Sequence, residues 1–300
     1  MRWMKQHWST AILVVILAVG LILLSYPTVS DYWNSFHQSR AIASYAEAVA
    51  EIDENEYEKI WENARQYNAQ MPDEKKRWSL NDDQRQDYER QLNIGGTGVM
   101  GYIEIPSIQV SLPIYHGTSE GVLQIAVGHI EGSSLPVGGM GTHCVLSGHR
   151  GLPSARLFTD LNKVEEGDRF FLRVLDETLT YEVDQIHIVE PNDLHYLEIE
   201  KGQDLCTLVT CTPYGINSHR LLVRGHRVAN DEDDSGSDIR VTADAIQIDP
   251  LLVTPVLAIP MLLVGLFLLL TGKGQSDTVG KSGKFDRSDK FDKSDKSGKE

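Results

Sequence analysis

Two residues near the C-terminal third of the chain have the types and the spacing needed for nucleophilic acyl transfer. Cys211 ends the apolar run "TLVTC", and Arg220 follows after eight intervening residues in "SHRLLVRG". A thiolate can attack a carbonyl carbon and form a covalent acyl intermediate. A guanidinium beside it can donate hydrogen bonds to the oxyanion that develops in that step. The spacing therefore predicts a β-hairpin that returns Arg220 beside Cys211.

Cys211 is expected at the end of a strand, where its side chain can reach a cleft. In a regular strand Leu208 and Thr210 face one side, whereas Val209 and Cys211 face the other. Pro213 cannot donate to a central ladder, so the strand must end close to it. A buried structural cysteine is the alternative interpretation, because free cysteines are common in protein cores.

A proton-transfer partner is the third requirement, and His149 is the best of the ten histidines. It follows a predicted strand end at Ser147 and Gly148 in "LSGHRG", and histidine is the usual general acid or base. The alternative is a surface or core histidine without a chemical role. The weaker candidates, which we interpret as packing or hydrogen-bonding groups, are His116, His129, His143 and His219. Without HExxH, CxxC or GxSxG motifs or a phosphate-binding glycine loop, the sequence predicts no metal and no cofactor.

The segments that must position these residues are rich in β-branched residues and separated by Gly, Pro, Asn and Asp. From residue 101 onward this pattern predicts about seven strands in a β-barrel or sandwich. Residues 34–93 are instead rich in helix formers, with a break at Pro72. We therefore expect a helical extension before a β-domain.

Two uncharged stretches are long enough to cross a membrane. Residues 11–26 are predicted as a transmembrane helix after a cytoplasmic N-terminus of residues 1–10, which is basic. A cleaved signal peptide is the alternative. Residues 251–270 are predicted as a second span and residues 271–300 as a disordered cytoplasmic tail. The chain would then cross the cell membrane twice, with residues 27–250 on the extracellular face.

The intervening region is acidic, with 37 acidic and 18 basic side chains between residues 27 and 250. This charge argues against nucleic acid as a partner, because nucleic acid requires a basic surface.

Several motifs resemble the sortases, the transpeptidases of Gram-positive bacteria. "TLVTC", "SHRLLVRG" and "LSGHRG" match the cysteine, arginine and histidine regions of that family. "GYIEIPSIQVSLPIYHGTSE" and "VGHIEGSSLPVGG" look like class C, the pilin-polymerising sortases. The resemblance implies a sortase-like closed β-barrel over residues 94–230, preceded by a helical extension and lid region over 27–93. The composition of the segment that follows predicts an acidic linker over 231–250.

The same resemblance implies roles for four residues and a reaction. Cys211 would be the nucleophile, His149 the proton-transfer group, Arg220 the oxyanion stabiliser and Thr210 part of substrate binding. The enzyme would cleave an LPxTG-like sorting signal between Thr and Gly and transfer the acyl group to a pilin lysine, without a cofactor. Its partners would be pilin subunits and the membrane bilayer. The alternatives are a sortase that anchors proteins to peptidoglycan and a non-catalytic membrane-tethered binding module.

Two features remain open from the sequence. Many class C sortases carry an Asp-Pro-aromatic plug in the lid, but the one Asp-Pro pair here is Asp249-Pro250. Trp78 could replace that plug or could anchor the helical segment through hydrophobic contact. Cys144 and Cys206 each lie five residues before a candidate catalytic residue, so they are expected to be adjacent, either bonded or as two inert thiols.

Overall fold

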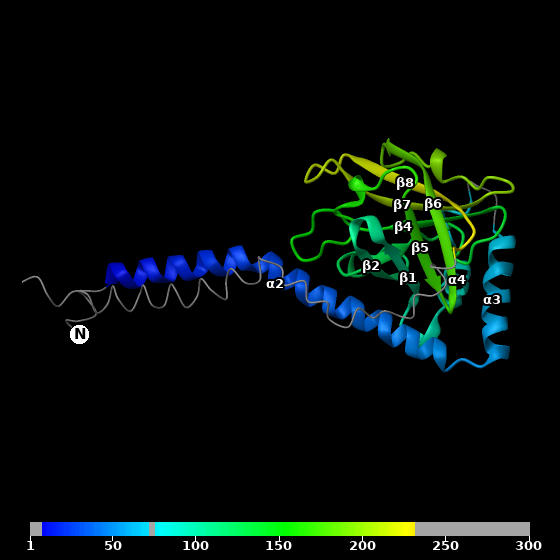
Figure 1. The fold of residues 1–300 in the computed structure, drawn as a ribbon, viewed down its shortest axis with the longest axis horizontal. Helices are drawn as coiled ribbons and strands as arrows, with labels where there is room; N and C mark the ends of the chain where they lie inside the picture. Colours follow the sequence, from blue (N-terminus) through cyan, green and yellow to red (C-terminus); the bar gives the residue numbers. More distant parts are fainter. Residues whose placement is uncertain (1–7, 72–75, 232–300) are drawn as a thin grey trace, which may run out of the picture.

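Eight strands close into a barrel in the order β1-β2-β3-β4-β7-β8-β6-β5, as seen on the right of Figure 1. This computed structural model describes residues 8–71 and 76–231. The strands are β1 (Val99–Ile105), β2 (Val110–His116), β3 (Val127–His129), β4 (Thr142–Ser147), β5 (Arg169–Val174), β6 (Glu177–Val189), β7 (Asp204–Thr212) and β8 (His219–Arg227). The predicted closed barrel is therefore confirmed.

The pairing of β4 with β7 decides how the site is built. These two strands are parallel, with Val145 opposite Thr207 and Ser147 opposite Val209. A long segment of chain, which includes β5 and β6, lies between them in the sequence. The pairing therefore places the C-terminal ends of both strands at the same end of the barrel. β3 has three residues and was not expected, because so short a strand has no visible alternation.

In the described part of the chain, three α-helices precede the barrel: α2 (Trp8–Ala50), α3 (Glu54–Ala69) and α4 (Asp82–Arg90). Asp53 caps α3 by accepting a hydrogen bond from the Glu56 amide at 2.9 Å. Asn81 and Gln84 form a reciprocal capping box at the start of α4. The helical extension is thus confirmed, with α3 ending at Ala69 and α4 beginning at Asp82. Pro72, where the sequence predicts the break, lies outside the described residues. The short helices are η1 (Ile94–Gly96), η2 (Pro106–Ile108), α5 (Glu120–Leu123), η3 (Leu161–Lys163) and η4 (His195–Leu197).

Side chains from α2 and α3 extend the barrel core. Tyr45 of α2 is buried, and its hydroxyl donates to the Met100 carbonyl at 3.1 Å and accepts from the Leu175 amide at 2.8 Å. Trp61 of α3 is buried in the same cluster. The C-terminal half of α2 is therefore fixed to the barrel by both apolar and polar contacts.

Alternation along β7 separates two apolar clusters. Leu208 belongs to the large core that fills the barrel. Val209 belongs to a second group, here called the outer-face cluster, which consists of Val145, Val189, Leu197, Val209 and Leu222. Because neighbouring residues of a strand face opposite sides, Cys211 lies on the same face as Val209, as predicted.

The N-terminal half of α2 contains the first predicted membrane span, and its apolar side chains are exposed, including Leu13, Ile16 and Leu23. Among the described residues, α2 is the one helix that is long and apolar enough to cross a membrane, which indicates membrane anchoring. The second predicted span 251–270, the tail 271–300 and all but one residue of the linker 231–250 lie outside the described residues. So do residues 1–7.

Candidate active site

Cys211 and Arg220 are direct partners across the β7–β8 hairpin. Cys211 is half-buried near the end of β7, and Arg220 follows the first residue of β8. Directly opposed residues of an antiparallel pair project to the same face with their Cβ atoms about 5 Å apart. The hairpin that the sequence predicts is confirmed, and it places the guanidinium-bearing side chain next to the thiol-bearing one.

His149 reaches the same end of the barrel through the parallel contact of β4 with β7. Both backbone groups of the preceding residue, Gly148, are bonded to β7. The Gly148 amide donates to the Val209 carbonyl at 3.0 Å, and the Thr210 hydroxyl donates to the Gly148 carbonyl at 2.7 Å. The histidine is therefore held one residue beyond a point fixed against the strand that carries Cys211.

Glycine is required at position 148 because the backbone passes close to a buried ring. A Cβ atom placed there would lie 2.6 Å from the ring of Phe158. The amide of Phe158 in turn donates to the His149 carbonyl at 3.1 Å. The His149 ring is 28% exposed, and its Nε2 lies 4.0 Å from the carboxylate of Glu120. The backbone around His149 is thus fixed while its ring can meet a ligand.

Arg150 is a positioning residue that the sequence did not reveal. Its guanidinium donates to the Thr159 carbonyl at 3.2 Å, to the Thr212 hydroxyl at 3.1 Å and to the Asn162 side chain at 2.8 Å. It therefore ties the loop after His149 to the residue after Cys211. An arginine in a loop is usually solvated, so no sequence signal distinguished it.

Thr210 is 2% exposed, and its hydroxyl is engaged with Gly148. We expect Thr210→Val to remove that donor and leave a buried carbonyl unpaired, which lowers the free energy of unfolding by about 1–2 kcal/mol. The shifted histidine should slow acylation by about tenfold, because small misplacements of catalytic groups are costly. Denaturant unfolding and single-turnover acylation measure both effects.

Thr210→Ser is the matched control, because it retains the hydroxyl. An acylation rate that falls equally in the serine and valine variants would show that the methyl group, and not the hydrogen bond to Gly148, is what matters.

Comparison with known proteins agrees with this geometry. Residues 103–228 match the family model described as the sortase domain. Sortase C1 from Streptococcus agalactiae is 57% identical, with a TM-score of 0.62, over 64% of this chain and 100% of that one. Sortase C from Streptococcus pneumoniae is 46% identical, with a TM-score of 0.58, over 63% of this chain and 97% of that one. Clostridium perfringens sortase C, solved with the C-terminal cell wall sorting motif, is 42% identical, with a TM-score of 0.56, over 63% of this chain and 98% of that one. The chain belongs to the sortase family.

It is a sortase-type cysteine transpeptidase of class C, the class of these solved structures. The expectation drawn from the sequence motifs is confirmed at the level of family and class. The individual roles of Cys211, His149, Arg220 and Thr210 remain predictions, which the geometry above supports.

In this sortase Trp78 covers part of the face that carries Cys211. The indole is half-buried and packs against the outer-face cluster, which includes Val209, two residues before Cys211. Arg77 stacks on the indole, with its guanidinium carbon 4.7 Å from the ring centroid, and donates to the Leu197 carbonyl at 2.9 Å. These contacts anchor residues 77–78 on the barrel. A plugging role for Trp78 stays a prediction.

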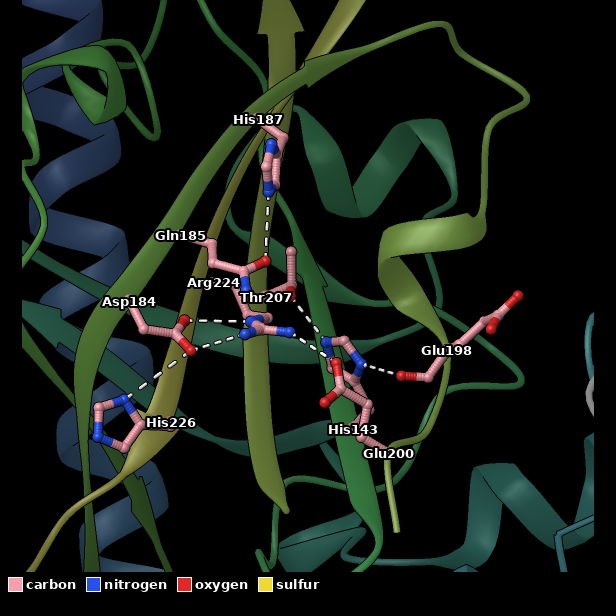
Figure 2. A network of polar contacts seen from close by, with 9 residues as sticks. All are labelled: His143, Asp184, Gln185, His187, Glu198, Glu200, Thr207, Arg224 and His226. Atoms are coloured by element: carbon pink, nitrogen blue, oxygen red, sulfur yellow. Dashed lines mark hydrogen bonds and ion pairs between the residues drawn. The ribbon is translucent and has the colours of Figure 1, made fainter.

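A partly buried polar network lies farther along the same strands, away from Cys211 (Figure 2). Arg224 pairs with Asp184 at 2.7 Å and with Glu200 at 2.8 Å, and its side chain is 13% exposed. Arg224 is therefore held in ion pairs, although an arginine on a strand beyond the predicted site would be expected to be solvated. Its partner carboxylates come from β6 and from the loop before β7, and sequence spacing could not pair them with it.

His143 joins β4 to the same network. Its Nε2 lies 2.7 Å from the Thr207 hydroxyl, and its Nδ1 lies 2.7 Å from the Glu198 carbonyl. Burial, with a smaller contribution from the nearby Arg224 charge, lowers the pKa of His143 from 6.5 to about 4. The ring is therefore neutral at pH 7 and serves as a hydrogen-bonding group, as expected.

This shift predicts a pH dependence of stability. The unfolded chain binds a proton at His143 below pH 6.5, whereas the folded chain does so below about pH 4. Stability is thus present above pH 6.5 and is lost as the pH falls towards 4, by about 3 kcal/mol. Urea unfolding from pH 7 to pH 4 should show this loss in the wild type and in His219→Gln, which changes an exposed histidine. His143→Gln should lack it, and equal slopes in all three proteins would contradict the assignment.

Cys144 and Cys206 are adjacent, as expected, because they are direct partners in the parallel β4–β7 ladder. Both are buried free thiols. They face the barrel core, the side opposite Cys211, so neither competes with it for a ligand.

Proposed function

We propose that this sortase cleaves an LPxTG-like sorting signal between Thr and Gly and joins pilin subunits through isopeptide bonds. Cys211 attacks the Thr carbonyl carbon and forms a thioester, and the peptide that begins with Gly leaves as an amine. Arg220 donates hydrogen bonds to the oxyanion of the tetrahedral intermediate. His149 protonates the leaving amine and then accepts a proton from the incoming amine.

The observation that carries this proposal is the direct opposition of Cys211 and Arg220 at the barrel end where Gly148 fixes His149. The substrate class is supported by the related structures, one of which was solved with a C-terminal cell wall sorting motif, whereas another concerns pilin substrate specificity. The acceptor in our proposal is a lysine ε-amine of a second pilin. Residues 94–230 form the catalytic domain, on the extracellular face of a two-pass membrane protein.

Mass spectrometry of surface polymers from wild-type and Cys211→Ala cells tests the proposal. Wild-type cells should yield pilin joined to pilin through lysine, and the variant should yield monomers. Anchoring of proteins to peptidoglycan is the competing function. An assay that offers purified pilin and a peptidoglycan-stem amine as acceptors separates the two, because preferential transfer to the stem amine would overturn the pilin assignment.

We further propose that Trp78 must leave the outer-face cluster before a sorting signal binds. Trp78→Ala should then raise the rate of acylation by a soluble sorting-signal peptide by about 3- to 10-fold. The indole contacts compete with binding of the peptide, and each 1.4 kcal/mol of such contact changes the binding equilibrium about tenfold. If Trp78 only anchors the helical segment, the variant will be less stable and no faster. Stopped acylation reactions and thermal unfolding distinguish these outcomes.

A further inference from the structure

The catalytic barrel is attached directly to the helix that contains the apolar anchor. Polar side chains just beyond the apolar stretch of α2 bond to backbone groups of two barrel loops. Asn34 donates to the Ser154 carbonyl at 2.7 Å, and Asp31 accepts from the Arg156 amide at 2.8 Å. One turn farther on, Gln38 donates to the Ile125 carbonyl at 2.7 Å. The predicted anchor and the segment that contacts the barrel therefore belong to one continuous helix, α2.

The spacing along α2 places the first of these loops at the level of lipid headgroups. Asp31 follows Tyr26, the end of the predicted span, by five residues, which is about 7.5 Å of helix rise. The headgroup layer on each side of a bilayer is about 5–8 Å thick. The loop that holds Ser154 and Arg156 thus lies at the outer side of the headgroup layer.

Exposed aromatic side chains on α2 begin at this level and continue beyond it. Tyr26, Tyr32, Trp33 and Phe36 are each more than half exposed. Aromatic residues gather at the membrane–water boundary because their rings are apolar and their edges tolerate water. Tyr26 and Tyr32 lie on either side of Asp31 within about 9 Å of helix rise, whereas Trp33 and Phe36 lie about 10 and 15 Å beyond Tyr26.

The turn between Cys211 and Arg220 lies against this loop. A Cβ atom on Gly151 would lie 2.7 Å from the ring of Tyr214, so the two segments are in contact. Tyr214 is 61% exposed, and Ile216, at the same turn, is 73% exposed. In Figure 1 the green and yellow loops at the left end of the barrel extend towards the apolar half of α2.

We propose that Tyr214 and Ile216 insert into the headgroup region of the bilayer that α2 crosses, so that the active site opens along the membrane surface. The occupant is lipid, because the turn continues the surface already formed by the anchor and its aromatic residues. The contact is apolar and not electrostatic, in keeping with the acidic extracytoplasmic region. For the proposed function, the consequence is faster acylation by membrane-tethered substrates.

Spin labelling of the full chain in phosphatidylglycerol–phosphatidylcholine vesicles tests the insertion. In a Cys211→Ala background, nitroxides are attached at Ile216→Cys and at Met140→Cys. Met140 is the matched control, because it is apolar and 80% exposed. It lies just before the first residue of β4, at the end of that strand opposite to His149. The parent without an added cysteine shows whether the buried Cys144 and Cys206 react. The label at 216 should be more accessible to oxygen, and less to a water-soluble nickel chelate, than the label at 140. Equal accessibility at the two positions would overturn the proposal.

Acylation rates test the functional consequence of this membrane insertion. Tyr214→Ser/Ile216→Ser should lower acylation by a vesicle-tethered sorting-signal substrate by about tenfold, since tethering acts through effective concentration. The same variant should change the rate of acylation by the soluble peptide by no more than about twofold, and Met140→Ser should change neither rate. An equal loss on both substrates would mean that the turn contacts the peptide itself, and no loss on either would remove the functional consequence. Failure of the proposed function is distinguishable, because the wild type would then not cleave the soluble peptide.

Discussion

Replacing Cys211 with alanine should abolish thioester formation and lower turnover of a sorting-signal peptide by about 10³-fold or more. The proposed nucleophile is lost, and no other thiol lies on the same face of the sheet, since Cys144 and Cys206 point into the core. The fold should survive, because the half-buried Cys211 belongs to neither apolar cluster. Intact-protein mass spectrometry after incubation with the peptide measures the acyl adduct.

Cys206→Ala is the matched control, since it removes a thiol five residues earlier on the same strand. This variant leaves a small cavity in the core and should be less stable, by about 1 kcal/mol. It should nevertheless still form the acyl adduct. An adduct on Cys211→Ala, or its absence from Cys206→Ala with the fold intact, would show that the nucleophile is misassigned.

Replacing Arg220 with alanine should lower kcat by about 10²- to 10³-fold and leave KM nearly unchanged. An oxyanion donor acts on charge that develops in the transition state, so its removal slows chemistry more than it weakens binding. The Arg220 side chain bonds only to nearby carbonyls, those of Asn217 and His219, among the described contacts. The substitution should therefore disturb the fold little, as circular dichroism can confirm.

Arg220→Lys distinguishes positioned hydrogen bonds from charge alone. Lysine keeps the positive charge but lacks the planar fork of donors, so it should recover only a small part of kcat. Full recovery would indicate that a general positive potential is sufficient. A rise in KM without a fall in kcat would assign Arg220 to substrate binding.

Local patterns were enough to predict the hairpin and the orientation of its residues. Pro213 and the short turn to Arg220 define where β7 ends and β8 begins, and strand alternation separates Leu208 from Val209 and Cys211. These features depend on residues close together in the sequence, where backbone geometry leaves few alternatives. The apolar stretch of α2 could be predicted from the sequence for the same reason.

Tertiary structure alone decided what fixes the site in place. The bond from Thr210 to Gly148 joins residues 62 positions apart, and it exists because β4 and β7 pair in parallel in one register. The Arg224–Asp184 ion pair and the contact of Asn34 with Ser154 likewise join distant segments. Periodicity shows which face of a strand is buried, but it does not show which strand lies beside it. Strand order and register follow from closing the whole barrel around one core, a condition that no short segment carries.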